Sequence, residues 1–149
     1  MKLTTLEKVL HLRRVPLFSE MTGRELRQVA EIAAEEVFPP KERIFSEGDP
    51  GSKLYILVEG VVEISLEGTL LAEVGVGNFF GEMSIFDKEP RSASATTKNK
   101  VVSLTLSSSD FRELVFVFPS VVFPILQHIS RNLRKANAEV RALSQEQKR

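Results

Sequence analysis

The chain has 149 residues, with 20 lysines and arginines, 20 aspartates and glutamates, a net charge of zero and no cysteine. Without cysteine there are no disulfides, thiolate metal sites or cysteine nucleophile, and without a basic excess we expect no nucleic-acid contact. No apolar run approaches the roughly 18 residues of a membrane span and the N-terminus lacks a signal-peptide core, so we expect a cytoplasmic protein without a membrane span.

Two helices are predicted within residues 1–34. Apolar residues at helical spacing predict a short helix over residues 3–14. Pro16 then interrupts the pattern. Thr22 and Glu25 fit the capping-box pattern, which predicts a second helix that begins at Thr22 and runs to about Ala34.

From residue 35 to residue 106 the apolar pattern changes to a period of two, which is typical of strands. The strands are short and separated by glycine-containing turns such as Glu59-Gly60 and Glu67-Gly68. This spacing predicts an antiparallel β-roll, a jelly-roll-like barrel. We therefore expect a single domain over residues 1–149, mainly β with flanking helices: helices over 1–34, the roll over 35–106 and helices over 107–149.

The C-terminal part, residues 107–149, predicts a hinge helix and a long helix. Ser108 or Ser109 can cap the hinge helix, and Pro119 separates it from a helix expected from about Val121 to Leu143, with a polar, frayed tail after it. The long helix carries apolar residues at heptad spacing: Leu126, Ile129, Leu133, Ala136, Val140 and Leu143. This seam favours a homodimer through the helix, although the same stripe also fits packing on the chain's own roll.

The stretch from Phe79 to Ala95 carries the candidate binding chemistry. Gly81 allows a close backbone approach, and the helix start that follows it presents free N–H groups that suit an anion. Arg91 can bind a phosphate with two hydrogen bonds, and Glu82 can accept one from a sugar hydroxyl. The plainer alternative is an ordinary helix start with Glu82 and Arg91 as a surface ion pair of little energetic value.

The segments Phe80-Gly81-Glu82-Met83-Ser84 and Pro90-Arg91-Ser92-Ala93 resemble the phosphate-binding cassette of cyclic nucleotide-binding domains. That family includes regulatory subunits of cyclic-AMP-dependent kinase, cyclic-nucleotide-gated channels and the bacterial catabolite activator protein. The resemblance implies that Glu82 holds the ribose 2′-hydroxyl and that Arg91 pairs with the cyclic phosphate. It implies further ligand contacts from the remaining matched positions: Gly81, Met83, Ser84, Ser92, Ala93, Ile64 and Leu71.

The resemblance also leaves the base open. A hydroxyl at Ser92 keeps cyclic GMP possible, and we favour cyclic AMP slightly. No aromatic residue follows Phe123, so we expect no stacking cap from the long helix and assign the cover of the base to Leu126, Ile129 or Arg134.

We predict a binding module and not an enzyme, with a cyclic nucleotide as ligand and no resident cofactor or metal. The two histidines fall on predicted helices without a nucleophile or a ligand set nearby, and we expect His11 to be exposed and His128 to lie at the surface or the seam edge. A cupin metal centre would require histidines on the strands, which have none. Three hypotheses stay open: a regulatory sensor that switches its C-terminal helices, the sensor half of a catabolite-activator-type transcription regulator, and a structural relative that binds no ligand.

Overall fold

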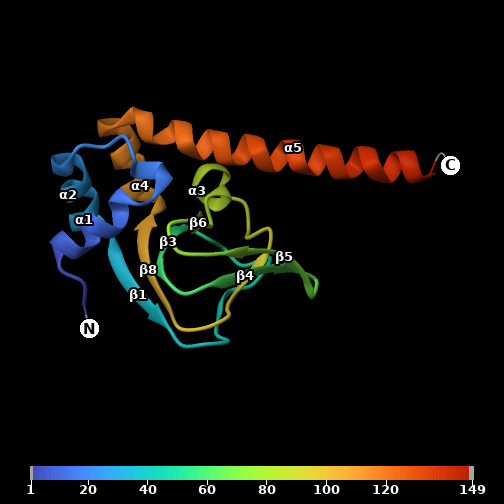
Figure 1. Cartoon of the computed structure of the whole chain (residues 1–149), viewed down its shortest axis with the longest axis horizontal. Helices are drawn as coiled ribbons and strands as arrows, with labels where there is room; N and C mark the ends of the chain where they lie inside the picture. Colours follow the sequence, from blue (N-terminus) through green and yellow to red (C-terminus); the bar gives the residue numbers. More distant parts are fainter. Residues whose placement is uncertain (1, 148–149) are drawn as a thin grey trace.

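Helices flank two small β-sheets in the computed structural model, which describes residues 2–147 (Figure 1). The helical elements are α1 (Thr5–Arg13), η1 (Pro16–Phe18), α2 (Gly23–Ile32), α3 (Met83–Asp87), α4 (Ser108–Val117), η2 (Pro119–Val121) and α5 (Val122–Gln147), where η marks a 3₁₀ turn. The strands are β1 (Ala34–Phe38), β2 (Arg43–Phe45), β3 (Lys53–Glu59), β4 (Val62–Leu66), β5 (Thr69–Val74), β6 (Phe79–Phe80), β7 (Ser94–Thr97) and β8 (Val101–Ser107).

The strands form two four-stranded antiparallel sheets that together make the predicted β-roll, which is thus confirmed. One sheet has the order β1-β8-β3-β6 and the other the order β2-β7-β4-β5. Strand β3 pairs with β8 on one side and with the two-residue strand β6 on the other. Because β6 leads directly into Gly81, this short pairing fixes the start of the candidate cassette at the edge of the first sheet.

The two N-terminal helices begin at capping boxes. Thr22 caps α2 with Glu25, as predicted, and Thr4 caps α1 with Glu7 at the third helical position. In each box the threonine hydroxyl accepts from the glutamate N–H while the carboxylate accepts from the threonine N–H, which satisfies two otherwise free donors.

Two apolar clusters stabilise the fold. The larger joins the helices to the first sheet and includes Phe18, Leu26, Leu104, Phe111 and Ile125. The smaller lies between the sheets and is built on Tyr55, Leu57, Val62, Phe80, Ala95 and Val101. Tyr55 and Phe80 stack with ring centroids 4.9 Å apart at an angle of 6°. The second cluster therefore supports the residue immediately before Gly81.

Helix α5 has 26 residues, or roughly 39 Å at 1.5 Å per residue, and it extends beyond the β-roll (Figure 1). The helix continues through Gln147, so the prediction of a frayed tail is wrong for residues 144–147. The last two residues of the predicted tail, Lys148 and Arg149, lie outside the described residues. Nothing after Leu143 breaks a helix, since neither glycine nor proline occurs there.

The apolar seam of α5 is largely uncovered. Ile129 packs on the larger core cluster, whereas Leu126, Leu133, Val140 and Leu143 are between 53% and 65% exposed. Packing on the chain's own roll therefore does not account for most of the stripe. Among the described helices, none is long and apolar enough to cross a membrane.

Candidate functional site

A cavity of about 470 Å³ lies between the second sheet, the segment around α3 and the helix α5. Its lining includes every residue that the sequence singled out as a ligand contact: Ile64, Leu71, Gly81, Glu82, Met83, Ser84, Arg91, Ser92 and Ala93. The lining also includes residues that the sequence argument did not name as ligand contacts, among them Phe45, Asn78, Phe79, His128 and Asn132. The volume lies in the range that small-molecule sites occupy.

Gly81 begins the cassette in a conformation that requires glycine. Its φ is +86°, and a Cβ there would lie 2.8 Å from the Lys53 carbonyl oxygen and 2.9 Å from Arg91 Nη1. Glu82 follows as the N-cap of α3, and the helix ends at Lys88, which is left-handed with φ 58°. Met83 and Ser84 begin α3 without a preceding helical turn to accept their N–H groups, whereas the Ile85 N–H donates to the Glu82 carbonyl over 3.2 Å.

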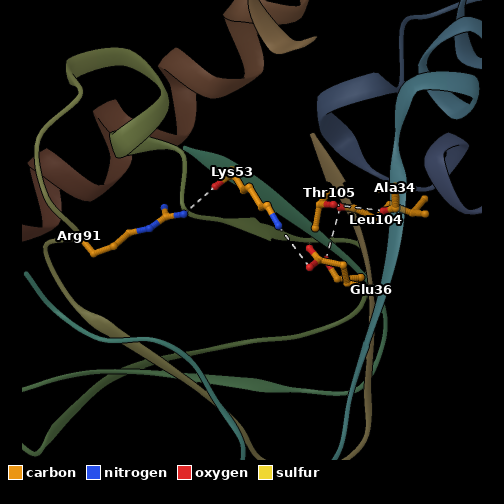
Figure 2. Close-up of polar contacts among 7 residues, drawn as sticks. Ala34, Glu36, Lys53, Arg91, Leu104 and Thr105 are labelled. Atoms are coloured by element: carbon orange, nitrogen blue, oxygen red, sulfur yellow. Dashed lines mark hydrogen bonds and ion pairs between the residues drawn. The ribbon is translucent and has the colours of Figure 1, made fainter. Parts of the chain in front are cut away.

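Arg91 is almost fully buried, with 6% of its surface exposed, and its guanidinium is held by neutral groups. Nη1 donates to the Gly81 carbonyl and Nη2 to the Lys53 carbonyl, each over 3.1 Å. Figure 2 shows Arg91 directed at Lys53, whose amino group in turn lies 3.3 Å from a carboxylate oxygen of Glu36. The guanidinium carbon also lies 4.1 Å from the centre of the Phe45 ring, a cation–π contact.

The surroundings of Arg91 leave part of its charge uncompensated. Its Nε is buried without a hydrogen-bond partner, and among residues 2–147 no carboxylate lies within 4.0 Å of the guanidinium. Burial lowers the pKa of Arg91 from its usual value, and the charges of Tyr55 and Glu82 oppose this shift. Three of its five N–H groups are not engaged by the two carbonyls, so an anion could still bind to them.

Glycine at position 51 makes room for this arginine. A Cβ at Gly51 would lie 2.1 Å from Arg91 Nε and 2.5 Å from Cζ, well inside contact distance. The backbone of Arg91 is fixed to the same turn, because its N–H donates to the Asp49 carbonyl and its carbonyl accepts from the Gly48 N–H, both over 2.8 Å. The turn at residues 48–51 thus fixes the backbone of Arg91 by hydrogen bonds and leaves the space that its guanidinium occupies.

Glu82 is 9% exposed and points toward α5. Its Oε1 lies 3.3 Å from Nε2 of His128, and Glu82 and Arg91 form no ion pair with each other. The alternative of a surface Glu82–Arg91 ion pair is therefore wrong, because both side chains are buried and each has other partners.

Helix α5 supplies a wall of the cavity through two residues that sequence reasoning missed. His128 lies against the Phe79 ring, with centroids 4.8 Å apart, and Asn132 lies one turn further along the helix. His128 is partly exposed, in line with the prediction of a surface or seam-edge residue, but it also lines the cavity, which was not predicted. The four-residue spacing of His128 and Asn132, off the heptad seam, was the available sequence signal.

Leu126, Ile129 and Arg134, from which cover of the base was expected, do not line this cavity. Leu126 and Arg134 line a separate shallow hollow along α5, and Ile129 packs on the core. His128 is the one residue with a ring that α5 contributes to the lining of this cavity.

The remaining predicted residues form the open, mostly apolar side of the cavity. Leu71 and Met83 are each 53% exposed, and Ile64 on β4 is half-buried. Ser92 is exposed, with its Oγ 3.9 Å from the Met83 sulfur. The cavity thus has a charged inner part at Glu82 and Arg91 and an apolar outer part that suits a flat, weakly polar group.

The family model described as the cyclic nucleotide-binding domain matches residues 35–117, more than half of the chain. The chain is 33% identical over 139 residues to the cyclic AMP receptor protein of Thermus thermophilus, covering 90% of this chain and 64% of that protein. It is 35% identical over 105 residues to the CRP-like cAMP-activated global transcriptional regulator of Mycobacterium tuberculosis, covering 67% of this chain and 47% of that protein. The chain therefore spans between about half and just under two thirds of these two relatives.

Solved structures show the same likeness. The catabolite activator protein of Thermus thermophilus superposes with a TM-score of 0.80 and 32% identity, covering 87% of this chain and 63% of that one. The N-terminal domain of a transcriptional regulator from Streptomyces coelicolor gives a TM-score of 0.69 and 33% identity, covering 89% of this chain and 94% of that one.

Proposed function

This chain belongs to the cyclic nucleotide-binding domain family, and we propose that it is a regulatory module that binds a cyclic nucleotide in the cavity beside α5. In this proposal the module acts by binding and not by catalysis, and ligand occupancy switches the C-terminal helices α4 and α5. Family membership comes from the comparisons, whereas the ligand, the site residues and the switch of this chain are what we propose.

The observation that carries the proposal is the buried Arg91 without an anionic partner. A buried guanidinium bonded only to carbonyls is costly, and a phosphate would supply the missing negative charge through two hydrogen bonds. Arginine can bind a phosphate through two parallel N–H groups, and the Nε–H of Arg91 has no hydrogen-bond partner among the described residues. A bound phosphate at Arg91 would bring its attached ribose within reach of Glu82.

The rest of the cavity supports a nucleotide over a bare phosphate. Glu82 can accept a hydrogen bond from a ribose hydroxyl, since a carboxylate accepts strongly from such donors. Ile64, Leu71 and Met83 offer apolar surface to sugar and base, and Gly81, Ser84 and Ala93 let the ligand approach the backbone closely. We infer a slight preference for cyclic AMP over cyclic GMP, in keeping with the two relatives whose names specify cyclic AMP.

The way in which α5 is attached supports the proposed switch. His128 and Asn132 line the cavity, while Ile125 and Ile129 hold the same helix to the core near α4. A ligand that contacts α5 in one arrangement and not in another would shift the population between them. We also infer a homodimer through the exposed seam residues Leu133, Val140 and Leu143, since such a seam buried between two helices is the coiled-coil arrangement.

A second candidate is the sensor part of a transcription regulator. The relatives in Thermus thermophilus and Mycobacterium tuberculosis extend well beyond the matched region, and the second is described as a transcriptional regulator. The coding sequence downstream of Arg149 discriminates between the two candidates, because a helix-turn-helix there would identify a DNA-binding half.

Two substitutions test the site. Arg91→Ala should weaken cyclic nucleotide binding by about 2–5 kcal/mol, because a desolvated phosphate loses its bidentate partner. Glu82→Ala should weaken binding less and should abolish discrimination against 2′-deoxy analogues. Arg43→Ala is the matched control, since Arg43 is an exposed arginine on the neighbouring strand β2. Unchanged affinity in Arg91→Ala would refute the assignment.

A further inference from the structure

His128 makes two contacts through one atom. Its Nε2 lies 3.3 Å from Glu82 Oε1 and also 3.3 Å from Asn132 Nδ2. The two contacts need opposite states of that nitrogen. Donation to the carboxylate requires a proton on Nε2, whereas acceptance from the Asn132 amide requires its lone pair. The imidazole therefore has one state that favours Glu82 and another that favours Asn132.

We propose that His128 is a positioning residue for Glu82, and that its protonation strengthens the binding of an anionic nucleotide in the cavity. This inference rests on the proposed function. Protonated His128 donates to Glu82 Oε1, which fixes the carboxylate and holds α5 against the segment that begins α3. The other carboxylate oxygen stays available to a ribose hydroxyl. Neutral His128 with the proton on Nδ1 turns its lone pair toward Asn132 and releases Glu82.

The direction of the effect follows from the charges around the cavity. Glu82 places a negative charge in a site that receives a phosphate, and this disfavours the ligand. A positive His128 beside Glu82 offsets that charge, and it also attracts the phosphate directly. The two effects have the same sign, so a lower pH should tighten binding.

The other charged groups near His128 do not reverse this direction. Within the described residues, those that share a cavity wall with it are Glu73 on β5, Glu20 after η1, Arg91 before β7 and Arg131 on α5. Glu73 is paired with Lys98 at 3.1 Å, and Arg91 is held by its two carbonyls. Glutamates and arginines keep their usual charges near neutral pH, whereas histidine is the side chain whose charge ordinarily changes between about pH 5 and 8.

The contact and the cavity coexist. With His128 at 3.3 Å from Glu82, the cavity still has a volume of about 470 Å³. A ligand therefore does not need to displace His128 to enter. The imidazole also stays in contact with the Phe79 ring, which keeps its position on α5 defined.

The test is the pH dependence of affinity, measured by calorimetric titration of the intact chain with cyclic AMP. The parent should bind about two- to fivefold more tightly near pH 5.5 than near pH 8, because a partly exposed ion pair changes an affinity by about this factor. Between these two pH values, binding should take up a fraction of a proton, seen as a heat that depends on the ionisation enthalpy of the buffer.

Three variants isolate the residue. His128→Gln should bind with the same affinity across this range, at the weak level of the parent at high pH. His128→Lys stays charged throughout and should bind with the tight affinity at both ends. His11→Gln, which removes the only other histidine of the sequence, should behave as the parent does.

The outcomes are distinct. A pH dependence that survives in His128→Gln, or a parent whose tight binding does not change with pH, overturns the role of His128 and leaves the proposed function intact. Absence of binding in the parent at every pH overturns the proposed function itself, and with it this inference.

Discussion

Replacing Gly51 by alanine should dislodge the buried arginine at the centre of the site. A Cβ at Gly51 would lie 2.1 Å from Arg91 Nε, and ordinary contacts begin at 3.4 Å, so the side chain must move by about 1.3 Å. Such a shift breaks the two 3.1 Å hydrogen bonds to the carbonyls of Gly81 and Lys53. Gly51 does not have a left-handed φ, so the cost of the substitution comes from the arginine and not from backbone strain.

The expected cost is moderate. Hydrogen bonds of a charged group are worth at least about 1.5 kcal/mol each, and the cation–π contact with Phe45 about 0.5–1 kcal/mol. Rehydration of the displaced guanidinium returns part of this, so we expect the free energy of unfolding to fall by about 2 kcal/mol. In a chain of this length that lowers Tm by roughly 4–8 °C.

Urea unfolding of matched variants is the assay. Gly75→Ala is the control, because a Cβ at Gly75 meets nothing within 4 Å and that glycine also avoids a left-handed φ. In an Arg91→Ala background the clash is absent, so Gly51→Ala should then cost less than about 0.5 kcal/mol. An equal cost with and without Arg91 would refute the reasoning. Gly51→Ala should also weaken cyclic nucleotide binding in the otherwise unchanged chain.

Three further outcomes are expected. Burial and the charge of Glu36 raise the pKa of Tyr55 above 10.0, against a smaller opposing effect of Arg91. The tyrosinate absorbance of this single tyrosine should therefore appear at higher pH in the folded chain than in urea. The free energy of unfolding should fall above about pH 10, and Tyr55→Phe should lack that fall. Tyrosinate that forms at the same pH in both states would contradict this. Ser92→Ala should weaken cyclic GMP binding and spare cyclic AMP, and equal losses for both would remove Ser92 from base selection. By light scattering the parent should be a dimer and a Leu133→Glu, Val140→Glu variant a monomer, whereas a monomeric parent at high concentration would end the dimer proposal.

Local patterns in the sequence predict most of this fold. The Thr22 cap, the period of two in the strands and the glycine-containing turns depend on neighbouring residues, and the structure has them at the expected places. The cap of α4 is Ser107 and not the predicted Ser108 or Ser109, so that prediction is wrong by one or two residues. The cassette residues also come from one short segment, residues 79–95. Because they are close in the sequence, the sequence alone predicts that they gather around Gly81. The division of the strands into two sheets depends on pairing between distant segments, which the sequence patterns do not specify.

The site details that could not be predicted all come from long-range contacts. Arg91 bonds to the carbonyl of Lys53, which is 38 residues away, and fits against Gly51, 40 positions earlier. His128 reaches Glu82 only because α5 crosses the cavity, a matter of packing between elements. The heptad spacing predicted that Leu126 and Ile129 contact the ligand. The four-residue spacing of His128 and Asn132 on the adjacent face is a weaker pattern and did not indicate a site by itself.

Calorimetric titration of the unaltered chain with cyclic AMP and cyclic GMP, with linear 5′-AMP as the control ligand, tests the central claim most directly. We expect saturable one-site binding of a cyclic nucleotide, with cyclic AMP no weaker than cyclic GMP, and a higher Tm in its presence. The 3′,5′-ring of a cyclic nucleotide fixes its phosphate close to the 2′-hydroxyl, as the proposed contacts with Arg91 and Glu82 require, whereas the 5′-phosphate of the linear nucleotide rotates freely, so the linear nucleotide should bind more weakly. No heat and no shift in Tm with either cyclic nucleotide at millimolar concentration would contradict the account and favour a structural relative that binds no ligand.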